Sequence, residues 1–470
     1  MQATLQGTIA AIGRSQTARM LLVGLLVLSL QIPIAMIGDL LSERQTRHQD
    51  AIQEVASKWG KLQVITGPVL TVPYRHRWTE IGNKRQMIAH SEVRHATFLP
   101  DRLSARGEMK SEIRYRGIFS VPIYRIQADV KGEFSRPDFA GWGIDPGDIM
   151  WDRAQMSVGI SDPRAIQEQT RLTWNSEGIS FLPGIGDFPT VSGTGIHAPL
   201  AGQLQAKRFT FSFPLTLNGS AGAYLVPVGR DTDVTLTSNW STPSFQGGWL
   251  PAHRAVSARG FEATWSIPYL GRDFPQAWMS VTDLRKTIES SRFGVDLIVP
   301  VDEYRLASRS VKYAALFILL TFASIWLTEV LAKLRVHPIQ YLLLGSALCV
   351  FYLLEISLSE QIGFGMAYLL ASLSVVGMVV AYSKVIFKTL GHATIIGLVV
   401  AALYGHLYIL LNNEDYALLV GSLGLFVILG LIMFLTRGVN WFATQFPGES
   451  PSTRPVGESA GGTEALTSNA

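Results

Sequence analysis

The chain has 470 residues, of which 48% are hydrophobic and 16% are charged. Soluble chains carry about 25% charged residues, so this composition argues against an ordinary soluble protein and favours a membrane protein. The net charge is +4 and the basic residues form no run, which excludes a nucleic-acid partner. The single cysteine, Cys349, excludes a disulfide framework within one chain and is interpreted as a small buried hydrophobe.

Six segments are long and apolar enough to cross a bilayer as helices, which takes about 20 residues each. The first precedes a charged middle region, and the other five follow that region in the last third of the chain. The first segment is too long for the apolar core of a signal peptide, so we expect it to remain as an anchor. The predicted segments are 20–41, 311–331, 338–358, 363–382, 390–411 and 416–435.

The short loops between these segments predict the orientation, because cations concentrate on the cytoplasmic side. All the loop cations fall on one side of the membrane, and the alternate loops, SEQIG and NNEDY, carry only acids. This pattern places both termini in the cytoplasm and residues 42–308 outside. The cations that carry it are Arg14, Arg19, Lys333, Arg335, Lys384, Lys388 and Arg437.

The exported region, residues 42–308, is predicted to be rich in β-strands. A helical start at 43–60 continues the first membrane helix outward. After it, apolar and polar residues alternate, as in IYRIQADVKGEF from Ile123 and FTFSFPLTL from Phe209. Alternation with turn clusters between the runs is typical of half-buried strands in a sandwich. One large sandwich and two smaller ones both fit the length.

The complete prediction is an α-helical membrane protein with six transmembrane helices and a large all-β, sandwich-like periplasmic domain inserted between helices 1 and 2. Residues 1–19 form the cytoplasmic N-terminus, and residues 309–442 form a five-helix transmembrane bundle. The last segment, 443–470, is rich in Pro, Gly, Ser and Thr and is predicted to be a disordered cytoplasmic tail.

Signatures of catalysis are missing from the sequence: it contains no HExxH, P-loop or G-x-S-x-G pattern. We therefore predict no catalytic, cofactor-binding or metal-binding residues. Ionisable groups inside membrane segments are candidates for function, but Glu329 and Glu355 lie toward helix ends. Glu329 is expected to pair with Lys333 on one helix face. His406 is the deepest ionisable group and the possible intramembrane polar site.

One stretch of the exported region, TSNWSTPSFQGGWLP, concentrates aromatic residues with Gly and Pro, so we expect it to leave regular strand pairing. Aromatic residues on a loop can anchor a binding partner. Trp240, Phe245 and Trp249 are therefore the candidate periplasmic contact surface. The alternative interpretation is that these rings fill the core of the sandwich.

Several stretches resemble the CreD family of Gram-negative inner membrane proteins, also described as cell envelope integrity proteins. They are TGPVLTVP, the long exported motif TLTSNWSTPSFQGGWLPAHRAVSARGFEATW, and the membrane segments RSVKYAALFILLTF, HPIQYLLLGSAL, FYLLEISLSEQIGF and MFLTRGVNWF. The resemblance covers about residues 20–442. It implies links to envelope integrity, to a two-component regulon and to the β-lactam and colicin responses, and it implies no catalytic residue.

Three functions are compatible with these features. The first is a non-enzymatic inner membrane protein that supports envelope integrity or the envelope stress response through its periplasmic β domain. The second is a membrane regulatory partner of a two-component sensor kinase, and the third is a transporter or flippase. The expected partners are the lipid bilayer and an unidentified periplasmic or inner membrane protein or envelope component, without nucleic acid or cofactor.

Overall fold

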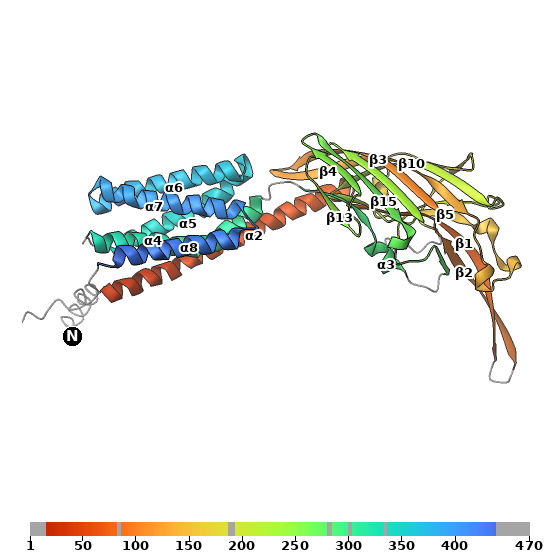
Figure 1. Ribbon diagram of the computed structural model, residues 1–470, viewed down its shortest axis with the longest axis horizontal. Helices are drawn as coiled ribbons and strands as arrows, with labels where there is room; N and C mark the ends of the chain where they lie inside the picture. Colours follow the sequence, from red (N-terminus) through yellow and green to blue (C-terminus); the bar gives the residue numbers. More distant parts are fainter. Residues whose placement is uncertain are drawn as a thin grey trace, which may run out of the picture. The chain divides into compact units, whose positions relative to one another are not determined.

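The structure is a computed structural model, and it describes residues 16–81, 86–186, 193–279, 284–298, 303–332 and 336–438. The chain divides into two compact units. We call Met1–Ser42 with Glu303–Ala470 the membrane unit, and Glu43–Asp302 the β unit. Figure 1 shows the helices of the first and the sheets of the second.

Six helices in the described part of the chain are long and apolar enough to cross a membrane, which confirms the prediction of six apolar helices. The first continues without a break past the end of the membrane unit, as the sequence from residue 43 to 60 predicts. The helices are α2 (Gln16–Trp59), α4 (Glu303–Leu331), α5 (Pro338–Ile362), α6 (Phe364–Phe387), α7 (Leu390–Asn412) and α8 (Ala417–Thr436).

The start of α5 is fixed by its sequence. His337 is the N-cap: its ring accepts a hydrogen bond from the Ile339 N–H, and the Gln340 side chain accepts one from the His337 N–H. These contacts satisfy two backbone donors that a helix start leaves free. Pro338 follows at the first helical position, where its missing N–H costs nothing. Gly363, with φ of 78°, separates α5 from α6.

The core of the membrane unit lies between α4, α5, α6 and α7, and α2 packs against α4 and α5. A Cβ atom at Gly345 of α5 would overlap with Leu30 of α2 and contact Phe322 of α4, so this glycine allows three helices to approach closely. A Cβ atom at Gly397 of α7 would likewise overlap with Val380 of α6, so this glycine allows α6 and α7 to approach closely. By contrast, α8 has no buried side chain, so it packs less extensively against the rest of the membrane unit.

The β unit contains two sheets with a short helix, α3 (Arg285–Ser290). The first sheet runs in the order β13 (Pro243–Gly247), β17 (Phe293–Leu297), β11 (Gly222–Leu225), β1 (Gln63–Ile81), β5 (Gln155–Ile160), β9 (Gly195–Pro199) and β8 (Leu182–Pro183), and β2 (Met87–Phe98) joins β1 to β16 (Ala277–Met279). The second runs in the order β14 (His253–Ser257), β15 (Gly260–Pro268), β12 (Asp231–Ser238), β3 (Arg102–Arg116), β4 (Phe119–Ser135), β10 (Arg208–Ser220), β6 (Arg171–Trp174) and β7 (Glu177–Ser180).

The alternation of apolar and polar residues decides which face of each strand is buried. In β10, Phe209, Phe211 and Phe213 are buried while the residues between them are exposed, as a period of two requires. Inward-facing side chains of both sheets belong to one hydrophobic cluster, which includes Trp174 and Trp265, both 1% exposed or less. The prediction of a large β-rich region is therefore confirmed.

Candidate functional site

A buried carboxyl group lies between two helices of the membrane unit. Glu355 of α5 is 0% exposed, and its Oε2 accepts a hydrogen bond from the Ser310 hydroxyl of α4 at 2.8 Å. Its second oxygen, Oε1, is buried and has no hydrogen-bond partner among the described residues. A polar atom in this state is rare in folded proteins, because losing water without a replacement partner costs free energy.

Tyrosine side chains of three helices lie near this carboxyl group. Tyr352 is one helical turn before Glu355 on the same helix face, and it is 1% exposed. The Phe351 ring lies 4.4 Å from the Tyr404 ring of α7 and 5.4 Å from the Tyr368 ring of α6, centroid to centroid. The Tyr368 hydroxyl donates to the Tyr404 carbonyl at 2.7 Å. Residues from four helices thus enclose one acid, and we call Ser310, Tyr352, Glu355, Tyr368 and Tyr404 the Glu355 cluster.

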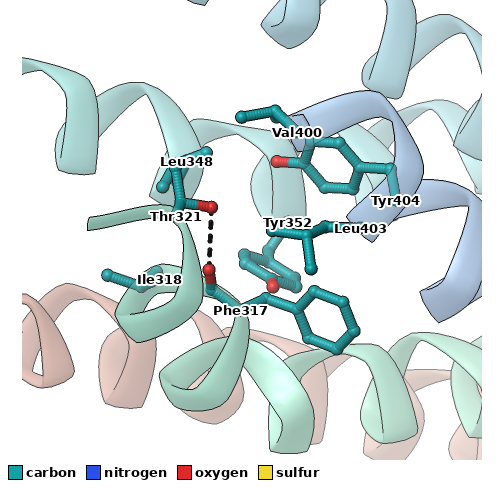
Figure 2. Close-up of a pocket in the computed structure, with 8 residues that line it drawn as sticks. All are labelled: Phe317, Ile318, Thr321, Leu348, Tyr352, Val400, Leu403 and Tyr404. Carbon is teal, nitrogen blue, oxygen red and sulfur yellow. Dashed lines mark hydrogen bonds between the residues drawn. The ribbon is translucent and has the colours of Figure 1, made fainter. Parts of the chain in front are cut away.

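A small cavity adjoins the Glu355 cluster at Tyr352 and Tyr404 (Figure 2). Its volume is about 10 Å³, close to the roughly 10–15 Å³ that one water molecule needs. Thr321 of α4 lines it, and its hydroxyl donates to the Phe317 carbonyl at 2.8 Å, the dashed line in Figure 2. The cavity beside the cluster therefore has a volume close to that of one water molecule.

Ion pairs join α4 to the end of α7. The Arg309 guanidinium donates to the carbonyls of Leu410 and Leu411, both at 2.9 Å, and to the Glu414 carboxylate at 3.0 Å. Arg305, one turn earlier, donates to the other Glu414 oxygen at 2.8 Å. A cation that satisfies the last carbonyls of a helix also complements its dipole. These contacts fix the end of the bundle toward which Glu355 lies.

Sequence reasoning missed this cluster. Glu355 was set aside because it lies toward the end of its helix, but the structure shows that its side chain is fully buried between helices. Glu329 is also buried, at 6% exposed, and accepts a hydrogen bond from the Tyr341 hydroxyl at 3.0 Å. Its predicted partner, Lys333, lies outside the described residues. Only the polarity of Glu355 within an apolar run could have signalled the site.

His406 of α7, the candidate from the sequence, is not part of this cluster. It is partly buried and faces a separate groove formed by α4, α7 and α8. Gly424 of α8 lies against its ring, since a Cβ atom there would overlap with the imidazole. Glu355 and His406 are therefore separate positions in the membrane unit, Glu355 buried between helices and His406 on a groove.

The three aromatic residues of the candidate contact surface are half-buried. Phe245 contacts Phe261 and Trp265 edge-on, with centroids 5.6 and 5.8 Å apart, and Trp240 and Trp249 also pack against the core of the β unit. The expectation that this stretch leaves strand pairing is wrong for its centre, because β13 pairs with β17. The contacts favour the interpretation that these rings fill the core.

A different part of the β unit is more exposed. Beyond Tyr74, β1 and β2 continue as a two-stranded ribbon, which Figure 1 shows extending away from the sheets. We call residues 75–81 and 87–94 the β1–β2 ribbon. Trp78 stacks between the rings of His76 and His90, at 5.5 and 5.1 Å. The exposed apolar side chains are Trp78 at 38%, Ile81 at 72%, Met87 at 80%, Ile88 at 47% and Val93 at 44%.

No group of three or more His, Cys, Asp or Glu side chains that could hold a metal ion occurs among the described residues. Together with the six apolar helices, the two sheets define a multi-pass membrane protein with a large β-rich unit. The chemistry that the described sites can support is hydrogen bonding or proton binding at Glu355, and contact with apolar partners.

A family model described as inner membrane protein CreD matches residues 15–442. Inner membrane protein CreD of Escherichia coli (strain K12) is 31% identical over 422 residues, which cover 90% of this chain and 92% of that protein. The chain belongs to the CreD family of inner membrane proteins. A solved M1 zinc metallopeptidase from Deinococcus radiodurans, bound to a Tyr-Ser-Ala substrate, aligns with 36% of this chain and 39% of its own at 10% identity, with a TM-score of 0.17 that carries no argument.

Proposed function

We propose that this inner membrane protein supports cell envelope integrity without catalysing a reaction, by holding a periplasmic or inner membrane protein through its β unit. In this proposal the β unit is a sandwich-like domain inserted between the first and second membrane helices and exported to the periplasm, and both termini are cytoplasmic. The order of the elements and the one-sided cations in the short loops support this topology.

The observation that carries the proposal is the β1–β2 ribbon. Side chains that stabilise a fold are buried, whereas Ile81 and Met87 are 72% and 80% exposed at the end of the ribbon. The two residues are directly opposite each other in the register, so their side chains lie on one face. A two-stranded ribbon alone is marginally stable in water, and an apolar surface at its end is typical of an interaction site.

The partner that fits this surface is a protein with an apolar groove. Trp78, fixed by stacking on His76 and His90, supplies a rigid aromatic anchor next to the apolar end. Such anchors carry most of the binding energy in protein interfaces. Trp240, Phe245 and Trp249 remain a second proposed contact surface, of lower priority because their rings pack on the core of their own unit.

The test uses the full-length protein in Gram-negative cells with a photo-crosslinking amino acid at Ile88. We expect one envelope protein to be captured, and we expect the double substitution Ile81→Asp and Met87→Asp to abolish the capture and increase detergent sensitivity of the cells. Leu270→Asp is the matched control, because Leu270 is 92% exposed elsewhere in the β unit and should leave both readouts unchanged.

Two results would contradict the proposal. Capture that survives the Asp substitutions would show that the apolar end is not the contact. Capture of a sensor kinase alone would support the regulatory alternative instead. A crosslinker at Trp249 in the same cells tests the second surface.

A further inference from the structure

A groove with a volume of about 770 Å³ lies between α4, α7 and α8 in the membrane unit. Small-molecule sites in proteins are typically about 300–1,000 Å³ and mostly apolar. Its lining fits that description: nearly all of it is Leu, Ile, Val, Ala or Gly. We call it the α8 groove.

The α8 groove runs lengthwise along its helices. On α4 its lining runs from Leu320 to Leu331, and on α7 from Ile395 to His406. Each span covers eleven residue steps, or about 16 Å of helix, roughly half of the ~30 Å hydrocarbon thickness. Since α4 and α7 are antiparallel, Leu320 and His406 lie at the same end of the groove. A chain-like molecule therefore fits along the helices better than a compact one.

The polar groups of the groove differ in whether they already have a hydrogen-bond partner. Ser324 and Thr328 line it, but their hydroxyls donate to carbonyls of their own helix at 2.7 and 2.9 Å. His406 makes no hydrogen bond to any residue that the structure describes, and it is the single ionisable side chain of the lining. The absence of a side chain at Gly424 leaves room for its ring. One end of the groove thus offers a hydrogen-bonding group, and the rest offers apolar surface.

We propose that the α8 groove binds one lipid molecule with a long acyl chain along α4, α7 and α8 and an acidic head group on His406. Water does not fill a groove with this lining, because apolar cavities stay dry. Bilayer lipid is the solvent around these helices, so lipid molecules are present next to the groove. The absence of buried side chains on α8 leaves that helix free to pack against a bound chain. This inference is independent of the function proposed for the β unit.

The test uses the full-length protein in detergent with a photoreactive diazirine analogue of palmitic acid as the probe. We expect peptides of α7 and α8 to be labelled, and unlabelled palmitic acid to compete. Ala402→Phe fills the groove and should remove most of the labelling. Ala401→Phe is the matched control, because Ala401 is the exposed neighbour of Ala402 and does not line the groove. Ala323→Phe, which fills the groove from α4, provides a second variant if Ala402→Phe does not fold.

The head-group contact has its own readout. His406→Leu keeps the groove apolar and should weaken binding of the palmitic acid probe by about tenfold, as expected when a hydrogen bond to a charged group is lost. Binding of the corresponding photoreactive alkane should not change. Equal labelling of the Ala402→Phe and Ala401→Phe proteins would overturn the site, as would labelling that palmitic acid does not compete. An unchanged affinity of the His406→Leu protein for the acid would overturn the role of His406.

Discussion

Two buried carboxyl groups, one in each unit, have opposite surroundings. Asp162 of the β unit accepts hydrogen bonds from the Lys61 N–H and from two nitrogens of Arg164, at 3.0–3.3 Å. Glu355 of the membrane unit accepts one, from Ser310, and its second oxygen has no partner among the described residues. Both carboxylates are nearly inaccessible, at 5% and 0% exposed.

The comparison distinguishes a structural acid from one that is available for other chemistry. Folding favours a buried polar group when its partners replace the lost water. Asp162 meets that condition, whereas Glu355 adds a desolvation cost for a single hydrogen bond. An acid that carries such a cost inside a membrane bundle is a candidate for function. The three predictions that follow test this distinction.

The largest effect is expected at Arg272, a buried cation of the β unit. Its guanidinium donates to the Pro227 and Val228 carbonyls at 3.2 and 2.8 Å and to the Gln276 side chain at 2.6 Å. Burial lowers its pKa to about 10, so it stays charged at neutral pH. Arg272→Met leaves these buried acceptors without donors, at about 1–3 kcal/mol each. We expect the free energy of unfolding to fall by about 3 kcal/mol or more. The measurement is urea unfolding monitored by tryptophan fluorescence.

A matched control separates lost hydrogen bonds from lost charge. Arg254 is exposed on the edge strand β14, so Arg254→Met should change the free energy of unfolding by less than about 0.5 kcal/mol. Equal losses in the two variants would show that Arg272 stabilises the β unit only through net charge.

A smaller, pH-dependent effect is expected at Asp162. Burial opposes its charge, but the hydrogen bonds from Arg164 and from the Lys61 N–H outweigh burial and hold the pKa of Asp162 below its ordinary value. A lowered folded pKa stabilises the protein above the unfolded pKa of about 4, and this stabilisation is lost as pH falls through the folded value. Asp162→Asn should therefore lower the free energy of unfolding by about 1 kcal/mol at pH 7. This value allows for solvent screening, because the Arg164 side chain is 69% exposed.

The Asp162 prediction is checked by the melting temperatures of both proteins at several pH values. The difference between wild type and Asp162→Asn should shrink below about pH 4, because the wild-type carboxylate then gains its proton. A difference that is constant from pH 7 to pH 3 would mean that the charge of Asp162 contributes nothing.

The membrane helices could be predicted because their signals are local. A long apolar run needs no distant partner, so the predicted segment 390–411 differs from α7, Leu390–Asn412, by one residue. Strand pairing is not local: β1 pairs in parallel with β11 and antiparallel with β2 and β5. The alternation in β10 predicts which face of the strand is buried, but it does not predict which strand pairs with it.

The candidate sites also depend on non-local contacts, which the sequence does not show. The position of Glu355 along α5 can be counted in the sequence, but the helix rotation that turns it toward Ser310 depends on packing across 45 residues. The aromatic stretch around Phe245 has the composition of a loop, yet tertiary pairing with β17 holds its centre in a strand. The exposure of Ile81 and Met87 was equally invisible, since their sequence pattern is that of an ordinary strand.

The smallest effect on stability is expected at Glu355. In Glu355→Leu an apolar side chain of similar size replaces a carboxyl group with one hydrogen bond, and the Ser310 hydroxyl can donate to a carbonyl of its own helix. Such replacements are often neutral or stabilising. We expect the free energy of unfolding to change by less than about 1 kcal/mol. The readout is the helical circular dichroism of the protein in detergent, because most helical residues lie in the membrane unit.

Stability alone does not decide the role of Glu355, so envelope resistance to detergent is measured in the same strains. Glu355→Gln is the matched variant, since it keeps the shape and the acceptor for Ser310 but cannot bind or release a proton. A stable Glu355→Gln protein that fails to support resistance would assign the function to proton binding at this carboxyl group. A Glu355→Leu protein that loses as much stability as Arg272→Met would contradict the comparison, because Glu355 would then be a structural acid like Asp162.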